Sequence, residues 1–236
     1  MYKKIKEIIK KILSAYPEYL CKKEYYNHIY TFNERPVEFR FVFEQLAKIY
    51  PDSILDVGVG TTALPHLMYN CGFKVTAIDN VTDYWKSEMF NRHYYVIDDD
   101  ITSTKLTEKY DLITCVSVLE HIEESDVAIS NMFSLLNDDG YLVLTCPYSE
   151  KEYIDDVYKR PLSKGGENAN YICQSFSRKN LNNWVSENNA SILKQEFWRF
   201  FDGEFWTEGN ENYPPVQVKQ DDVHQLTCVL LKKNNG

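Results

Sequence analysis

Apolar runs and helical periodicities alternate along most of this chain, starting near residue 53. The runs typical of strands are 54–57, 73–78, 94–97, 110–116, 141–146, 191–200 and 224–232. Apolar positions recur every three or four residues, as in amphipathic helices, over 36–49, 63–71, 123–136 and 177–188. Strands that alternate with helices build a mostly parallel α/β sheet, whose ligands bind at the carboxyl ends of the strands. The pattern therefore predicts an α/β domain with its site at that edge.

The first strand–helix–strand unit carries residues typical of a nucleoside site. Gly58 and Gly60 follow the first strand and let a ligand approach the backbone closely. Asp79 ends the second strand, where a carboxylate can accept hydrogen bonds from ribose hydroxyls. Gly58-x-Gly60-x-x-Ala63 also satisfies the loose dinucleotide pattern, so an NAD(P)-dependent oxidoreductase is an alternative. Asp56 opposes that alternative, because a carboxylate beside this loop repels pyrophosphate and suits a cationic ligand.

Residues 1–50 are predicted to form a helical extension ahead of the sheet. Ile5, Ile8, Ile9 and Ile12 recur at helical spacing, and lysines occupy most of the positions between them. A basic amphipathic helix of this kind can lie on a membrane surface, or it can pack on the domain or on a second subunit. The pattern leaves these alternatives open.

Composition narrows the range of partners. The 236 residues include 26 basic and 35 acidic side chains, a net charge of −9, so nucleic acid is not expected as a partner. No run of eighteen or more apolar residues predicts a membrane span. The six cysteines form no CxxC pair, and the N-terminus lacks the apolar stretch of a signal peptide. These features predict a cytoplasmic protein with reduced thiols.

Two segments resemble the class I S-adenosylmethionine (SAM) methyltransferases. Residues 53–79 are similar to the first motif of that family, and the phrase LEHI at 119–122 is similar to its fourth motif. Thr62 stands where the family usually has a third glycine. The resemblance covers about 35–232. It implies a Rossmann-like seven-stranded sheet, mostly parallel with an antiparallel last strand, in a cofactor-binding domain of residues 51–236.

The resemblance also implies how SAM, and its product S-adenosylhomocysteine, would be held beside the glycine loop. Arg35 would pair the cofactor carboxylate, and Glu38 or Asp56 would pair its ammonium group. Asp79 would bind the ribose, and Asn80 beside it joins the set of cofactor-binding residues.

The end of the third predicted strand carries three adjacent acids, Asp98, Asp99 and Asp100. In the resembled family an acid at this position accepts a hydrogen bond from the adenine amino group, and the next apolar residue lies on the ring. Asp100 with Ile101 fits that arrangement best, and Asp99 is the alternate. Ser117, at the end of the fourth strand, completes the predicted cofactor-binding residues.

His121 is the predicted general base, because imidazole titrates near neutral pH. The alternative is a structural role at the start of a helix. Glu120 would orient His121, and Tyr148, near the end of the fifth strand, would face the same cleft. No metal is predicted, because Ser117 stands where a metal-binding subgroup of the family has an acid.

Residues 148–175 form a long polar connection rich in tyrosine, which predicts a lid over the acceptor. Tyrosine and tryptophan rings suit a small polar organic acceptor. Together with the resemblance, these features predict methyl transfer, with oxygen as the favoured acceptor atom, in glycan, nucleotide-sugar or secondary-metabolite tailoring. The alternatives are an N- or protein methyltransferase, an NAD(P)-dependent oxidoreductase and a non-catalytic SAM-binding protein. A homodimer is left open.

Overall fold

The computed structural model describes residues 32–86, 89–166 and 171–235, together with residues 4–6, 8, 9, 11, 12, 15, 19 and 22. The chain divides into two compact units, Met1–Glu34 and Arg35–Gly236. The described residues among the first 22 are helical. The predicted boundary at 50/51 lies inside the second unit, so the helix that precedes the first strand belongs with the sheet.

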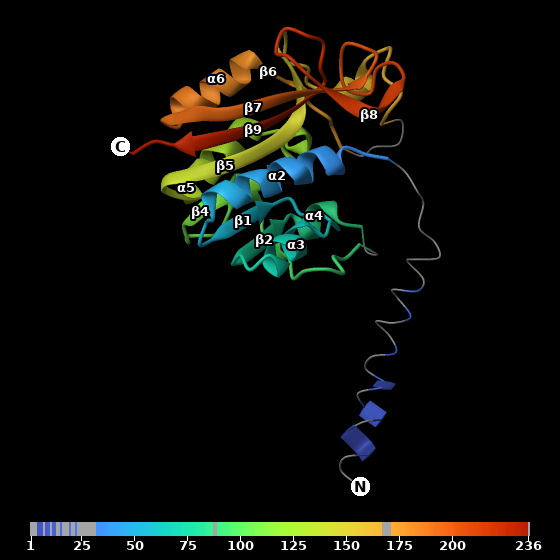
Figure 1. Cartoon of the computed structure of the whole chain (residues 1–236), viewed down its shortest axis with the longest axis vertical. Coiled ribbons are helices and arrows are strands. Elements are labelled where there is room, and N and C mark those ends of the chain that lie inside the picture. Colours follow the sequence, from blue (N-terminus) through green and yellow to red (C-terminus); the bar gives the residue numbers. More distant parts are fainter. Residues whose placement is uncertain are drawn as a thin grey trace. The chain divides into compact units, whose positions relative to one another are not determined.

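The second unit is built around one mixed sheet (Figure 1). Its strands are β1 (Ile54–Val57), β2 (Val75–Asp79), β3 (Ile97–Asp98), β4 (Tyr110–Val116), β5 (Leu136–Ser149), β6 (Phe176–Ser177), β7 (Ala190–Phe201), β8 (Glu211–Val218) and β9 (Leu226–Lys233). Their order is β3-β2-β1-β4-β5-β9-β7-β8, with β6 beside β5. The strands from β3 to β5 pair in parallel, whereas β9 runs antiparallel to both of its neighbours. The predicted seven strands and antiparallel last strand are confirmed, and β6 and β8 add to them.

Helices cover both faces of this sheet. They are α2 (Arg35–Ile49), α3 (Leu64–Asn70), α4 (Val81–Tyr84), α5 (Ser125–Leu135) and α6 (Arg178–Glu187), with the 3₁₀ turns η1 (Ile101–Ser103), η2 (Leu119–His121) and η3 (Val157–Lys159). Successive strand residues face opposite sides of a sheet. Accordingly, Leu55 joins the apolar core that contains α5 and α6 residues, while Ile54 joins the core that contains α2 and α3 residues. The sheet thus separates two cores.

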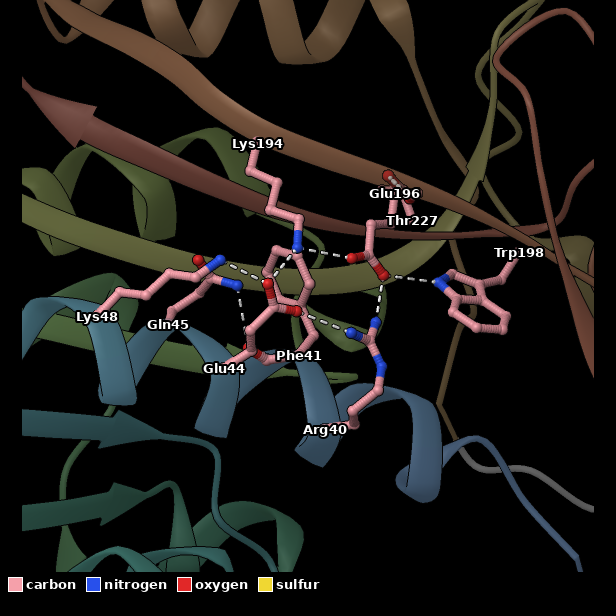
Figure 2. A network of polar contacts seen from close by, with 9 residues as sticks. All are labelled: Arg40, Phe41, Glu44, Gln45, Lys48, Lys194, Glu196, Trp198 and Thr227. Carbon is pink, nitrogen blue, oxygen red and sulfur yellow. Dashed lines mark hydrogen bonds and ion pairs between the residues drawn. The ribbon is translucent and has the colours of Figure 1, made fainter.

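A network of charged side chains fastens α2 to β7 (Figure 2). Glu196 on β7 is almost fully buried and is bonded by Arg40 of α2, by Lys194 at 2.9 Å and by the Trp198 indole nitrogen at 3.2 Å. Lys194 also pairs with Glu44 of α2 at 2.8 Å. Because buried charges need such partners, the network fixes where α2 lies on the sheet.

Several strand boundaries differ from those predicted, and one further strand was not predicted. The third strand is Ile97–Asp98 rather than 94–97. The fifth begins at Leu136 rather than at 141, because residues 137–140 form an irregularity in its pairing with β4. β8 lies between the predicted strands 191–200 and 224–232, although Pro214 and Pro215 lie in it. Proline is tolerated there because β8 is an edge strand that pairs only with β7.

The cysteines and the lengths of the helices point to no further function. Cys115, Cys146, Cys173 and Cys228 are buried free thiols, and they act as small apolar side chains in the core. Among the helices that the structure describes, none has the length and apolar character needed to cross a membrane.

Candidate active site

A cavity of about 1230 Å³ lies at the carboxyl edge of the sheet. It is walled by the segments that follow β1, β2, β3 and β4, by the start of α2 and by the 148–175 connection. The predicted site residues on its walls are Arg35, Gly58, Gly60, Asp79, Asn80, Asp99, Asp100, Ile101, Ser117 and His121. A pocket for one drug-sized ligand measures about 300–1,000 Å³, so this cavity can hold a cofactor and a second small molecule.

The glycine loop after β1 depends on both glycines. Gly58 has φ 71°, and a Cβ there would overlap the Val118 side chain. Gly60 has φ 51°, and no described atom lies within 4 Å of the place where its Cβ would stand. Its amide donates to Asp79 Oδ2 at 2.6 Å, which ties the loop to the end of β2. The loop is therefore held open toward the cavity by backbone geometry that other residues rarely adopt.

Asp79 is an acceptor held in a partly dry site. Burial raises the pKa of its carboxyl, against hydrogen bonds from Gly60 and Trp85 that lower it. Among the described residues, the carboxylates on the cavity walls are Asp79, Asp83, Asp99 and Asp100, and the side chains with a fixed positive charge are Arg35 and Lys86. This excess of acids suits a ligand that carries positive charge and no phosphate.

The three acids at the end of β3 have different surroundings. Asp98 is exposed and accepts hydrogen bonds from the Val81 and Thr82 amides, at 2.9 and 3.1 Å, at the start of α4. Asp99 accepts from the Thr104 hydroxyl and the Lys105 amide. Asp100 caps η1 and accepts from the Asn80 amide group at 3.0 Å. Asp99 and Asp100 line the cavity, whereas Asp98 holds α4 instead.

Glu38 does not line the cavity but holds two residues that do. Its fully buried carboxylate accepts from the Ser117 and Thr145 hydroxyls, at 2.5 and 2.7 Å, and pairs with Arg35 at 2.7 Å. Arg35 also donates to the Val116 carbonyl at 3.3 Å. Ser117 has φ 50°, a conformation that costs free energy for a residue with a Cβ and tends to occur at functional sites. Glu38 therefore positions Arg35 and Ser117.

Asp56, the other predicted ammonium partner, is buried behind the glycine loop. Its Oδ1 accepts from the Thr114 hydroxyl at 2.6 Å, while Oδ2 has no hydrogen-bond partner among the described residues. Burial raises the pKa of the Asp56 carboxyl to about 7, opposed by Thr114 and Arg35. With Arg35 it lines a void of about 10 Å³, which is about the room that one water needs. The structure places Asp56 near the cavity but outside its wall.

His121 is presented to the cavity by η2. Its Nδ1 lies 2.7 Å from the Ile172 carbonyl oxygen, and the Tyr171 ring meets it edge-on at 4.5 Å between ring centres. Because a carbonyl can only accept, Nδ1 carries the proton of this bond and Nε2 is the basic nitrogen of the neutral ring. Glu120 Oε1 lies 3.9 Å from Nε2. The pair can thus take up a proton at Nε2 and stabilise the resulting charge.

Tyr148, predicted to be catalytic, is buried away from the cavity wall. Its hydroxyl donates to Glu150 at 2.9 Å, and its ring stacks on His224 at 5.7 Å. Burial raises the pKa of its phenol, which disfavours the phenolate that a base would need. The predicted role of Tyr148 therefore gains no support from its position.

In the described ranges, no group of three or more His, Cys, Asp and Glu side chains is placed to hold a metal ion.

The cavity has aromatic walls that the sequence did not assign to particular residues. Tyr84 and Trp85 follow β2, while Tyr158 and Tyr171 come from the 148–175 connection. The Tyr171 ring contacts His121, and the centre of the Tyr158 ring lies 6.4 Å from that of Tyr171. Their abundance in a polar loop was the available signal, but loop sequence alone does not specify which rings face inward. The two rings from the 148–175 connection border the part of the cavity beside His121.

Comparisons with known proteins agree with this geometry. A family model described as a methyltransferase domain matches residues 27–195, more than half of the chain. The ubiquinone biosynthesis O-methyltransferases of Glaesserella parasuis and Rickettsia canadensis are 27% and 28% identical to it over 121 and 131 residues. These matches cover 47% and 50% of this chain, and 51% and 55% of the two relatives. The chain thus spans about half the length of these relatives.

Solved structures share the fold at lower identity. The N-methyltransferase NodS from Bradyrhizobium japonicum, in complex with S-adenosylhomocysteine, has a TM-score of 0.52 and 15% identity, covering 86% of this chain and 88% of its own. The 1,6-didemethyltoxoflavin-N1-methyltransferase of Burkholderia thailandensis has a TM-score of 0.56 and 13% identity, covering 83% and 77%. At these identities the likeness shows a shared fold.

SAM is the cofactor of this family, and the residues on the cavity walls fit it. The open glycine loop, the strand-end carboxylate of Asp79 and the acidic walls suit a nucleoside that carries an ammonium and a sulfonium. The NAD(P)-dependent alternative is set aside, because the family model that matches is a methyltransferase. On the combined strength of that match and the fold, the chain belongs to the class I SAM-dependent methyltransferases.

Proposed function

We propose that this enzyme methylates an oxygen atom of a small polar organic acceptor. The observation that carries the proposal is His121, whose ring faces the cavity with Nδ1 bound to the Ile172 carbonyl. Further support comes from the two relatives, which are named as O-methyltransferases. This chain matches about half of the length of each. The tyrosine rings beside His121 suit the apolar faces of a phenol or a sugar.

The chemistry of an oxygen acceptor explains why a base is needed. SAM supplies an electrophilic methyl group. A hydroxyl group must lose its proton as its oxygen forms the new bond, and Nε2 of His121 would accept that proton. Glu120, with Oε1 3.9 Å from Nε2, would stabilise the imidazolium that results. Arg35 and Ser117, held by Glu38, would keep the methionine end of the cofactor in place.

Replacing His121 tests the proposal. A positioned base contributes about 10² to 10⁴ in rate, so His121→Gln should lower single-turnover methyl transfer to phenol or sugar hydroxyls by that factor. SAM affinity, measured by calorimetry, should change little. The assay is release of S-adenosylhomocysteine with a panel of phenols, sugar alcohols and amines. His66→Gln is the matched control, because His66 bonds Asn70 on α3 and is absent from the cavity wall.

Two outcomes would contradict the proposal. An unchanged rate in folded His121→Gln would leave His121 with a structural role. Turnover with amines or with a peptide amine, and none with hydroxyl acceptors, would favour the N- or protein methyltransferase instead.

A further inference from the structure

The N-terminal segment carries an apolar helical face that the methyltransferase site does not use. Ile5, Ile8, Ile9 and Ile12 follow one another at helical spacing, and all four are helical in the structure. Their exposed fractions are 48%, 57%, 50% and 67%. Tyr19, a further seven residues along, is also helical and is 60% exposed. Large apolar side chains gathered on one exposed face indicate an interaction surface.

The charge of this segment is opposite to that of the rest of the chain. Residues 1–13 contain five lysines and one glutamate, which gives the segment +4 and leaves −13 for the rest of a chain whose total is −9. The lysines lie at positions 3, 4, 6, 10 and 11, between the isoleucines. On a helix this spacing places most of them on the face opposite the apolar one.

A partner of this segment must bind the apolar isoleucine face and the lysine side chains at the same time. An anionic bilayer does so, because its acyl boundary takes apolar side chains while its headgroups attract lysines. A second copy of the chain is disfavoured as the partner of this face, since pairing would set two segments of +4 side by side. A bilayer also matches the length of the segment. Lysines recur between the isoleucines along the chain, so the segment can lie in the interface but is not an apolar run long enough to span a bilayer.

We propose that the segment carrying Ile5, Ile8, Ile9 and Ile12 binds the surface of an anionic membrane as a helix lying in its plane. The isoleucines enter the boundary between headgroups and acyl chains, and the lysines contact the headgroups. The strongly acidic remainder of the chain is repelled by the same surface, so only this segment inserts. The inference does not depend on the acceptor or on the proposed base.

Vesicle sedimentation of the full chain, without cofactor or acceptor, tests the proposal. We expect binding to vesicles that contain phosphatidylserine and little binding to phosphatidylcholine alone. Each lysine near an anionic surface contributes roughly fivefold in affinity, so Lys4→Glu with Lys11→Glu should weaken binding at least about 25-fold. Ile8→Ser with Ile12→Ser should weaken it by more than about tenfold, because the buried apolar side chains are lost.

A matched control separates the effect of the lysines in this segment from the effect of the net charge of the whole chain. Lys179→Glu with Lys219→Glu changes the net charge by the same amount at exposed lysines of the second unit, and should leave sedimentation unchanged. Equal loss in both double variants would overturn the proposal, as would equal binding to the two kinds of vesicle. No vesicle binding, together with a dimer that the isoleucine variant dissociates, would assign the face to a second copy of the chain. Melting temperatures of all variants should match that of the unmodified protein.

Discussion

At the scale of single residues, the acids after β3 show how identical side chains take different tasks. Asp98 and Asp100 are two positions apart and carry the same carboxylate. Asp98 holds the first amides of α4, whereas Asp100 caps η1 and stands on the cavity wall. Asp99 is engaged by Thr104 and Lys105. We therefore propose Asp100 as the acid that accepts a hydrogen bond from the adenine amino group.

Paired substitutions test that assignment. Asp100→Asn keeps an oxygen for the Thr102 amide but removes the charge, and loss of a charged hydrogen bond costs about 1.5–3 kcal/mol. SAM affinity measured by calorimetry should thus fall about ten- to a hundredfold. Asp98→Asn, the matched control, should change affinity little and lower the melting temperature slightly through a weaker cap on α4. The larger loss of affinity at Asp98 would place the adenine elsewhere.

Asp56 should make the stability of the cofactor-free protein depend on pH. Burial raises the pKa of this carboxyl from 3.8 to about 7. Between these values the folded protein holds a proton that the unfolded chain has released, so the free energy of unfolding falls as the pH rises. Asp56→Asn keeps an acceptor for Thr114 and removes the titration. Between about pH 4 and about pH 7, the Asp56→Asn variant should therefore lose less free energy of unfolding than the unmodified protein does. The difference should be on the order of a few kcal/mol.

Urea unfolding at a series of pH values measures this difference. Asp52→Asn is the control, since Asp52 is exposed and its substitution should leave the slope of stability against pH unchanged. An Asp56→Asn variant with the same slope as the unmodified protein would mean that Asp56 stays ionised in the folded state.

The position of a residue along a strand was predictable at this site, but the direction of its side chain was less so. The glycines and acids at strand ends line the cavity because the parallel topology brings those ends to one edge. Glu38 and Tyr148 were also assigned to it, but neither lines the cavity, and they bond Thr145 and Glu150 instead. Which face a residue presents depends on register and on long-range bonds, such as that of Glu38 to Thr145, which local sequence does not reveal.

At the scale of elements, the hydrophobic pattern predicted which strands and helices exist better than it predicted where each begins and ends. The central strands were predictable because they are continuous apolar runs buried on both faces. β8 was missed because its sequence, ENYPPVQV, carries two prolines and alternates little, features that an edge strand tolerates. β6 has two residues, Phe176 and Ser177, and exists only through pairing with β5. No local pattern could have predicted it.

The 148–175 connection is bound to the domain more firmly than its composition suggested. Ile154 and Ser175 exchange backbone hydrogen bonds of 2.9 Å, and the Val157 amide donates to the Cys173 carbonyl at 2.7 Å. The Gln174 amide donates to the Glu120 carbonyl at 2.9 Å, beside His121. The first two sets of contacts join residues within the connection, and the third ties it to the segment that holds His121. The described part of the connection is therefore a wall of the cavity, and the predicted lid motion stays a prediction.

At the scale of the whole molecule, every described residue that walls the candidate cofactor site lies in the second unit. The site is walled by described residues from Arg35 onward, and Arg35 itself is the first residue of α2. α2 carries Phe41, Val42 and Leu46 into the core at exposures of 0%, 0% and 1%, and the Glu196 network fastens it to β7. The helix that the sequence placed in the extension is thus part of the catalytic domain.

This division predicts what two shortened chains should do. A chain that begins at Phe32 keeps α2 with Arg35 and Glu38, so its melting temperature should match the full chain and its SAM affinity should agree within about twofold. A chain that begins at Tyr50 loses the three buried side chains of α2. Each contributes about 1.5–3 kcal/mol, a large part of a typical stability of about 5–15 kcal/mol, so this chain should fail to fold.

Calorimetry and thermal unfolding of both chains check this prediction. The first chain should also lose vesicle binding while it keeps methyl transfer to a soluble acceptor, because the isoleucine face has been removed and the cavity has not. Normal melting of the Phe32 chain together with lost SAM binding would show that residues 1–31 contribute to the cofactor site. Folding of the Tyr50 chain would show that the core contacts of α2 are dispensable and that the catalytic domain begins at β1.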